Sequence, residues 1–105
     1  MIWSHLLHEA IEHGATDIHV QSGTVFWRLG MDVVPTEYEL SDEDMLSFLT
    51  DQVQTISDTM MSYDGAMTFE GLRIRVHIFR WRSGWGGTLR ILYPPKTGLD
   101  NSEEG

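Results

Sequence analysis

The sequence has no cysteine, and only three of its 105 residues are proline. The absence of cysteine excludes disulfide bonds and thiolate metal sites, and it suits a reducing compartment. Long hydrophobic runs are also missing, since no apolar stretch approaches the roughly 18 to 20 residues that cross a bilayer. The N-terminus shows no basic segment before an apolar stretch, as a secretory signal would. We therefore expect a cytoplasmic protein.

Basic residues are scarce: 7 Lys and Arg stand against 16 Asp and Glu, for a net charge of −9. Five arginines are nevertheless concentrated between residues 71 and 93, where no acidic residue occurs: Arg73, Arg75, Arg80, Arg82 and Arg90. That segment carries +5 and the remainder of the chain carries −14. Clustered arginine commonly binds phosphate or carboxylate. Alternatively, these side chains alternate outward on strands and pair with the acidic helix of the same domain.

The length and the 41% hydrophobic content suffice for one small domain with one core. Helical spacing of apolar residues predicts a helix over residues 2–13 and one or two helices between 42 and 62, with Ser41 as N-cap. Alternation and β-branched residues predict strands over residues 16–21, 24–29, 33–35, 66–69, 72–79 and 88–93, with residues 63–65 ending the helical region and a glycine-rich loop at 83–87. Pro35 confines the third strand to a sheet edge or ends it. This order predicts an α+β fold, an antiparallel sheet of about six strands with helices covering one face.

The predicted first helix carries His5, His8, Glu9 and Glu12 on one face, at the spacing i, i+3, i+4 and i+7. Such a face offers imidazole and carboxylate ligands for zinc or nickel. The His-Glu-x-x-His pattern of zinc peptidases is not met, because His13 follows His8 by one residue too many and points about 140° away from it. We therefore interpret this face as an ordinary exposed helix surface and expect no metal site.

Arginine and tryptophan are interleaved around the predicted glycine-rich loop, at Arg80, Trp81, Arg82 and Trp85. Aromatic rings between guanidinium groups suit single-stranded nucleic acid. They equally suit a protein contact, in which Trp and Arg are favoured anchors. Because the remainder of the chain is strongly acidic, we expect a partner contact at this loop and no nucleic acid.

Motifs for catalysis are absent from the sequence. No Gly-x-x-x-x-Gly-Lys-Ser/Thr segment is present, so the chain has no Walker A motif, and the glycine-rich segment at 83–87 does not substitute for one. A Gly-x-Ser-x-Gly nucleophile motif is missing too. The chain alone is therefore not expected to hydrolyse ATP.

Three segments, taken in order, resemble a known family. They are residues 14–20 (Gly-Ala-Thr-Asp-Ile-His-Val), residues 26–32 (Phe-Trp-Arg-Leu-Gly-Met-Asp), and residues 72–77 (Leu-Arg-Ile-Arg-Val-His) followed by 89–92 (Leu-Arg-Ile-Leu). With the acidic helix between them, they make residues 2–95 similar to the N-terminal domain of the type II and type IV secretion and pilus ATPases, a group that includes the pilus-retraction motor of twitching motility. The turn at Gly30, Met31 and Asp32 departs from the Asp-Gly of the family.

The resemblance implies a PAS-like domain over residues 1–95 that precedes a RecA-like motor domain in a ring, usually a hexamer. Residues 96–105 are then a linker or tail toward that motor domain, which this chain lacks. Arg75 and Arg90 match the family arginines that reach the nucleotide phosphates and couple domain closure to ATP turnover. Asp17 and His19 also match family positions, and we expect them to serve strand and turn structure more than chemistry.

The resemblance also implies cofactors, partners and a location. ATP and Mg²⁺ are bound only through the motor domain and not by this chain alone. The implied partners are that motor domain, the neighbouring ring subunits and the inner-membrane platform of a secretion or pilus system, so the assembled protein is cytoplasmic and peripheral at the inner membrane, acting in protein transport.

A second hypothesis stays open beside this one. The chain is then a free-standing PAS-like sensor or adaptor that binds a protein or a small ligand through the loop carrying Trp81 and Trp85. A Walker A motif encoded beyond Gly105 favours the first hypothesis, and a stop codon there favours the second.

Overall fold

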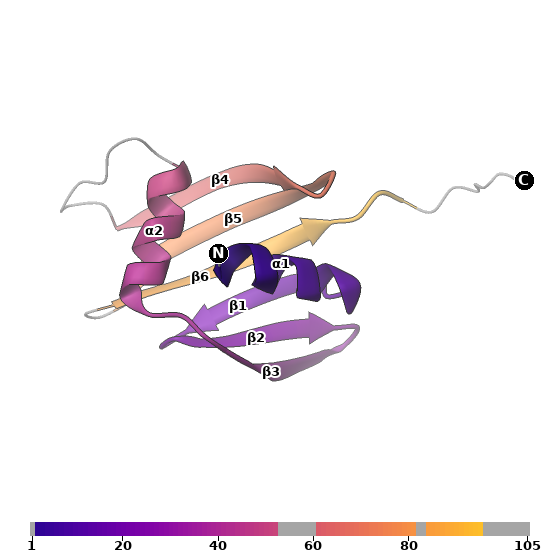
Figure 1. The fold of residues 1–105 in the computed structure, drawn as a ribbon, viewed down its shortest axis with the longest axis horizontal. Coiled ribbons are helices and arrows are strands. Elements are labelled where there is room, and N and C mark those ends of the chain that lie inside the picture. Colours follow the sequence, from indigo (N-terminus) through magenta and orange to yellow (C-terminus); the bar gives the residue numbers. More distant parts are fainter. Residues whose placement is uncertain (1, 53–60, 82–83, 96–105) are drawn as a thin grey trace, which may run out of the picture.

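The computed structural model describes residues 2–52, 61–81 and 84–95. These residues form two helices and six strands (Figure 1). In chain order they are α1 (Ile2–Glu12), β1 (Asp17–Gln21), β2 (Thr24–Leu29), β3 (Asp32–Glu39), α2 (Asp42–Gln52), β4 (Ser62–Phe69), β5 (Leu72–Trp81) and β6 (Gly84–Leu92). The predicted elements between 53 and 60 and the predicted tail at 96–105 lie outside the described residues.

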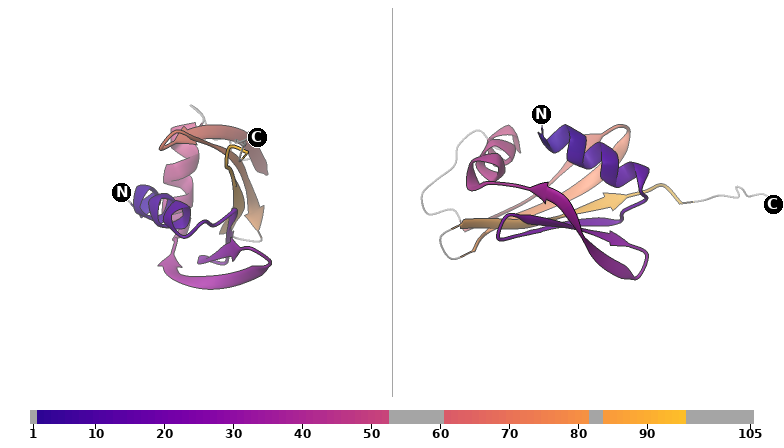
Figure 2. Two further views of the ribbon diagram at one scale, coloured as in Figure 1. Left: turned by 90° about the vertical axis from the view of Figure 1, so that its right-hand side faces the viewer. Right: turned by 60° about the horizontal axis from the view of Figure 1, so that its bottom comes forward.

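The six strands form one antiparallel sheet in the order β3-β2-β1-β6-β5-β4. Each half of the chain contributes a three-stranded meander, and the first and last strands join the two halves at the centre of the sheet. Both helices lie on the same face of the sheet (Figure 2). The predicted α+β class, with about six antiparallel strands and helices over one face, is confirmed.

The core lies between the helices and one face of the sheet, because alternate strand residues point toward the helices. Strand β5 shows this alternation most clearly, since Ile74, Val76 and Ile78 are buried while the residues between them are exposed or half-buried. The helices contribute the apolar side chains Trp3, Leu6, Leu7, Ala10, Met45, Phe48 and Leu49. The rings of Trp3 and Phe48 lie 4.2 Å apart, and the Trp3 indole donates to the carbonyl of Asp44 at 2.9 Å.

The start of α2 has the predicted cap. The amide of Asp44 donates to the hydroxyl of Ser41 at 3.1 Å, and the amide of Ser41 donates to the Asp44 carboxylate at 2.9 Å. This reciprocal pair satisfies two amides that the first helical turn leaves without partners. Asp44 takes the place that Glu usually holds in this motif.

Three predicted boundaries are wrong, each because a turn-forming residue was given too much weight. Strand β3 continues through Pro35 to Glu39, which an edge strand tolerates since the missing amide can face away from the sheet. Strand β4 begins at Ser62 and so includes residues 63–65.

The third wrong boundary is the glycine-rich loop at 83–87, because Gly84–Leu92 is a continuous strand. The glycines are needed there for close approach of the neighbouring strands. A Cβ at Gly87 would lie 2.9 Å from the carbonyl oxygen of His77, and a Cβ at Gly86 would lie 3.0 Å from that of Val20. Glycine at these positions therefore reflects strand packing and not loop conformation.

Candidate functional site

The sheet face that α1 and α2 leave uncovered, hereafter the open face, carries most of the described arginines. A row of side chains crosses all six strands on this face, since each residue is directly opposite the next in the strand register. From β3 to β4 the row is Val33, Arg28, Asp17, Arg90, Arg75 and Ala66. Three arginines thus stand in one line with a single carboxylate among them.

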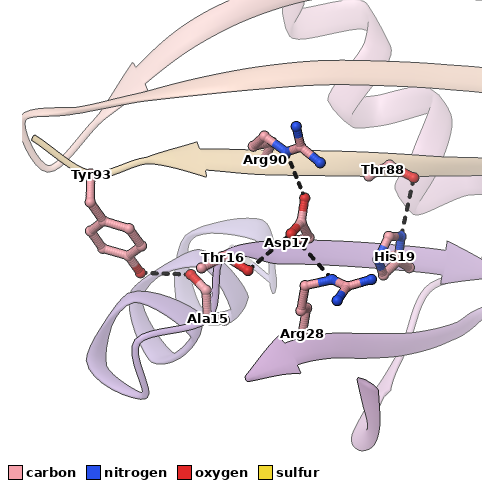
Figure 3. A network of polar contacts seen from close by, with 8 residues as sticks. All are labelled: Ala15, Thr16, Asp17, His19, Arg28, Thr88, Arg90 and Tyr93. Atoms are coloured by element: carbon pink, nitrogen blue, oxygen red, sulfur yellow. Dashed lines mark hydrogen bonds and ion pairs between the residues drawn. The ribbon is translucent and has the colours of Figure 1, made fainter. Parts of the chain in front are cut away.

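Asp17 is the centre of this row (Figure 3). Its carboxylate accepts a hydrogen bond from Nε of Arg90 at 2.9 Å and one from the Thr16 hydroxyl at 2.9 Å, and it lies 3.7 Å from Nε of Arg28. The residue is only 4% exposed although it belongs to the open face. The two arginines come from the strands on either side of β1, so Asp17 joins β2, β1 and β6 through side chains.

The environment of Asp17 keeps it ionised. Burial raises the pKa of the carboxyl, but the hydrogen bonds from Arg90 and Thr16 and the charges of Arg90 and His19 together outweigh burial, so its pKa lies below the ordinary value of 3.8. A charged Asp17 fixes the stem of Arg90 through the Nε atom. The Arg90 side chain remains 66% exposed, and its terminal nitrogens hydrogen-bond to no described residue.

Arg75 is directly opposite Arg90 on the neighbouring strand. Both side chains line a hollow of about 210 Å³ together with Asp64, Val76, His77 and Thr88. Within the described part of the chain, the side chain of Arg75 has neither an ion pair nor a hydrogen bond. Like charges directly opposite one another destabilise an antiparallel pair. The arrangement therefore favours an anion that both guanidinium groups can contact.

The adjacent row on the open face is polar and aromatic. In the same strand order it contains Pro35, Phe26, His19, Thr88, His77 and Asp64. Nδ1 of His77 lies 2.6 Å from the Asp64 carboxylate, and Nδ1 of His19 lies 3.3 Å from the Thr88 hydroxyl. The acidic residue nearest to Arg75 in this row is thus engaged by a histidine.

The structure brings together the two arginines for which phosphate contact was predicted, Arg75 and Arg90. Of the five arginines between residues 71 and 93, Arg90 pairs with Asp17 of β1 and not with the acidic helix α2. Arg28 of β2 also lies within ion-pair distance of Asp17. The sequence analysis missed this role of Arg28. The signal was the alternation within residues 24–29, which places Arg28 on the same face as Phe26.

The structure describes only part of the predicted partner contact at the tryptophan loop. Trp85 is only 7% exposed and belongs to the core, and Arg80 lies over its ring at 4.7 Å. Arg82 and the side chain of Trp81 lie outside what the structure describes. The second hypothesis, a sensor that binds through this loop, therefore loses one of its two aromatic contacts.

On the face of α1 that carries the predicted ligands, His8 contacts carboxylates of the same chain. His8 lies 2.7 Å from the carboxylate of Glu70 and 3.4 Å from that of Glu12. Among the described residues, no group of three or more His, Asp or Glu side chains is arranged to hold a metal ion.

Comparisons with known proteins do not identify the chain: no protein-family model matches it, and neither does a curated protein. Across residues 2–52, 61–81 and 84–95, no helix is long and apolar enough to span a membrane.

Proposed function

We propose that this chain is the non-catalytic N-terminal domain of a hexameric type II secretion or type IV pilus ATPase. In this proposal, Arg75 and Arg90 contact the phosphates of a nucleotide held by a RecA-like motor domain. The observation that carries the proposal is the placement of these two arginines directly opposite each other on the open face, with no acidic partner for Arg75 in the described residues. The family resemblance assigns phosphate contact to the same two positions.

The open face suits such a contact in shape as well as in charge. Neither helix covers it, so another domain can approach it across the full width of the sheet. Asp17 holds Arg90 by Nε alone and leaves the terminal nitrogens to face that domain. A guanidinium fixed in this way is suited to bidentate contact with phosphate oxygens. Mg²⁺ and the residues that hydrolyse ATP would come from the motor domain.

Ring assembly belongs to the same proposal. Contacts of the open face with nucleotide and motor domain would change as ATP is hydrolysed, so movement of this domain is coupled to the nucleotide state. The neighbouring ring subunits and the inner-membrane platform of the secretion or pilus system are the further partners we propose.

The first experiment is to read the coding sequence downstream of Gly105. A Walker A motif there supports the proposal and supplies the longer protein for a kinetic test. In that protein, Arg90→Ala is expected to lower ATP turnover about 10- to 1000-fold, as loss of a charge-stabilising donor does. A stop codon directly after Gly105 would remove the motor domain from the proposal.

Controls separate this effect from loss of folding. Arg90→Lys keeps the charge but loses the planar fork, so it should recover only part of the turnover. Arg73→Ala removes the same charge two residues from Arg75 on the open face and should lower turnover much less. Unchanged turnover in a folded Arg90→Ala variant would reduce Arg90 to a structural partner of Asp17.

A further inference from the structure

A pocket of about 460 Å³ lies on the open face beside the arginine row. Phe26 of β2 and Phe79 of β5 line it from either side of the two central strands, and Val33 of β3 adds a further apolar contact. The backbone of Gly86 and Gly87 contributes to the lining. Gly86 has no side chain on this face, and the ring of Phe79 lies against it, since a Cβ at Gly86 would be 3.2 Å from that ring. The volume is in the range of small-molecule sites.

Few polar groups reach this pocket. They are the His19 ring, the Thr88 hydroxyl and Gln21, which line it together with the apolar residues. An apolar hollow with aromatic walls and a small number of donors and acceptors is suited to a planar heterocycle, which stacks on the rings and hydrogen-bonds at its edge. The neighbouring hollow at Arg75 and Arg90 is suited to an anion, as described above.

The spacing of the two hollows fits one ligand. Thr88 lines both of them, so they are adjacent along β6. Gly86 and Arg90 are four residues apart on this strand, or about 13 Å at roughly 3.3 Å per residue. This is the scale of the span from the base to the outer phosphates of an extended nucleoside triphosphate.

We propose that the pocket between Phe26 and Phe79 binds the base of a nucleoside phosphate whose phosphates lie on Arg75 and Arg90. The inference rests on the proposed function for the phosphate end of the ligand and adds the base pocket to it. It departs from the expectation that nucleotide is bound only through a motor domain, since all of these residues belong to one sheet face of this chain.

A mononucleotide fits this face better than a nucleic acid strand. Polymer binding depends on neutralising many phosphates along a basic surface. Here the arginine-rich segment carries +5, and the remainder of the chain carries −14. A short run of phosphates at two arginines avoids this repulsion, whereas a polymer leaving the open face would meet it.

The test is titration calorimetry of the 105-residue chain with ATP and with tripolyphosphate. ATP is expected to bind at least 10-fold more tightly than tripolyphosphate, because only ATP carries a base. Phe79→Leu should weaken ATP binding about 5- to 10-fold, the effect of losing one stacking contact, and leave tripolyphosphate binding unchanged. Arg75→Gln should weaken binding of both ligands.

Matched variants separate the loss of a stacking contact from a general effect of the substitution on folding. Phe26→Leu repeats the aromatic change on the opposite wall, so the test does not depend on Phe79→Leu being folded. Phe69→Leu makes the same change on the helix-covered side of β4 and should alter neither affinity. Equal affinity for ATP and tripolyphosphate would overturn the base pocket, as would a short oligothymidylate that binds more tightly than ATP.

The outcome is distinguishable from failure of the proposed function. Calorimetry on the isolated chain reports the base pocket without any motor domain, whereas turnover of the longer protein reports the phosphate role of Arg90. If Phe79→Leu weakens ATP binding while Arg90→Ala leaves turnover unchanged, the pocket is supported and the coupling to ATP hydrolysis is not.

Discussion

The two faces of the sheet are built from the same six strands, yet different forces hold them together. The covered face buries Ile74, Val76 and Ile78 of β5 against two helices. The open face carries Arg73, Arg75 and His77, the residues that alternate with them, and these are exposed. One face is therefore stabilised by removal of apolar area from water, and the other by a few ion pairs and hydrogen bonds.

Asp17 shows how the open face stays ordered without helices over it. Its carboxylate is buried beneath Arg28 and Arg90 and connects three adjacent strands. Tyr93 adds a contact where β6 ends beside the start of β1, because its hydroxyl donates to the carbonyl of Ala15 at 2.7 Å (Figure 3). The covered face therefore provides most of the apolar burial, and the open face is left to carry charged groups.

The largest loss of stability is expected from a substitution on the covered face at Leu89, which is fully buried in the centre of the sheet. Leu89→Ala should lower the free energy of unfolding by about 2 to 5 kcal/mol, because it removes buried methyl groups and leaves a cavity. Urea denaturation measures the change.

Leu92 offers the matched control for this variant. It lies on the same strand, but it is on the open face and 40% exposed. Leu92→Ala should change the free energy of unfolding by less than about 0.5 kcal/mol. Similar losses in the two variants would mean that the open face is covered in solution, for example by a second copy of the chain.

A smaller effect is expected from Asp17→Asn, which breaks the ion-pair network of the open face. The free energy of unfolding should fall by about 1 to 3 kcal/mol at neutral pH, since the amide lacks the negative charge and one of the two acceptor oxygens that the buried carboxylate offers to the arginines. The pKa of Asp17 is lowered in the folded protein, so its carboxylate contributes stability above the ordinary value of 3.8. That contribution disappears as the pH falls through the lower folded-state value, so the two proteins should converge in acid.

Asp64→Asn is the control, because it makes the same change on the open face at a side chain that is 74% exposed. Its effect on stability should stay below about 1 kcal/mol, as for other exposed pairs. A wild-type protein that keeps its full advantage over Asp17→Asn below the folded-state pKa would show that the charge of Asp17 is not what stabilises the network.

The sequence predicts the alternation of β5 correctly because one residue in two is apolar from Leu72 to Ile78, and the pattern is local. The prediction of a loop is wrong at residues 84–87, because glycine favours flexible loops but also occurs in strands. In the fold, Gly86 and Gly87 are required by the close approach of Val20 and His77 across the sheet. That requirement depends on which strands become neighbours, which local composition does not show.

The candidate site was predictable only in part for the same reason. Resemblance singled out Arg75 and Arg90, but residue spacing alone does not place them opposite each other. The link between Arg90 and Asp17 joins residues 73 positions apart and depends on the pairing of β1 with β6. Phe26 and Phe79 meet at one pocket through that pairing too, so no local pattern indicates a base site.

The smallest effect on stability is expected at the rim of the covered face, where His8 of α1 contacts the turn between β4 and β5. The hydrogen bond and charge of Glu70, with the charge of Glu12, raise the pKa of His8 above its ordinary value of 6.5. Glu70→Gln should therefore lower this pKa, which an NMR titration of the imidazole measures. Glu12→Gln should lower it less, because Glu70 makes the shorter contact.

The sign of the stability change follows from the direction of this shift. A raised pKa means that protonated His8 stabilises the fold below about pH 6.5, and that this contribution is lost as the pH rises through the folded-state value. The contribution is small because the ring is exposed to solvent, and salt should weaken it further. If Glu70→Gln leaves the titration of His8 unchanged, this ion pair does not tie α1 to the β4–β5 turn.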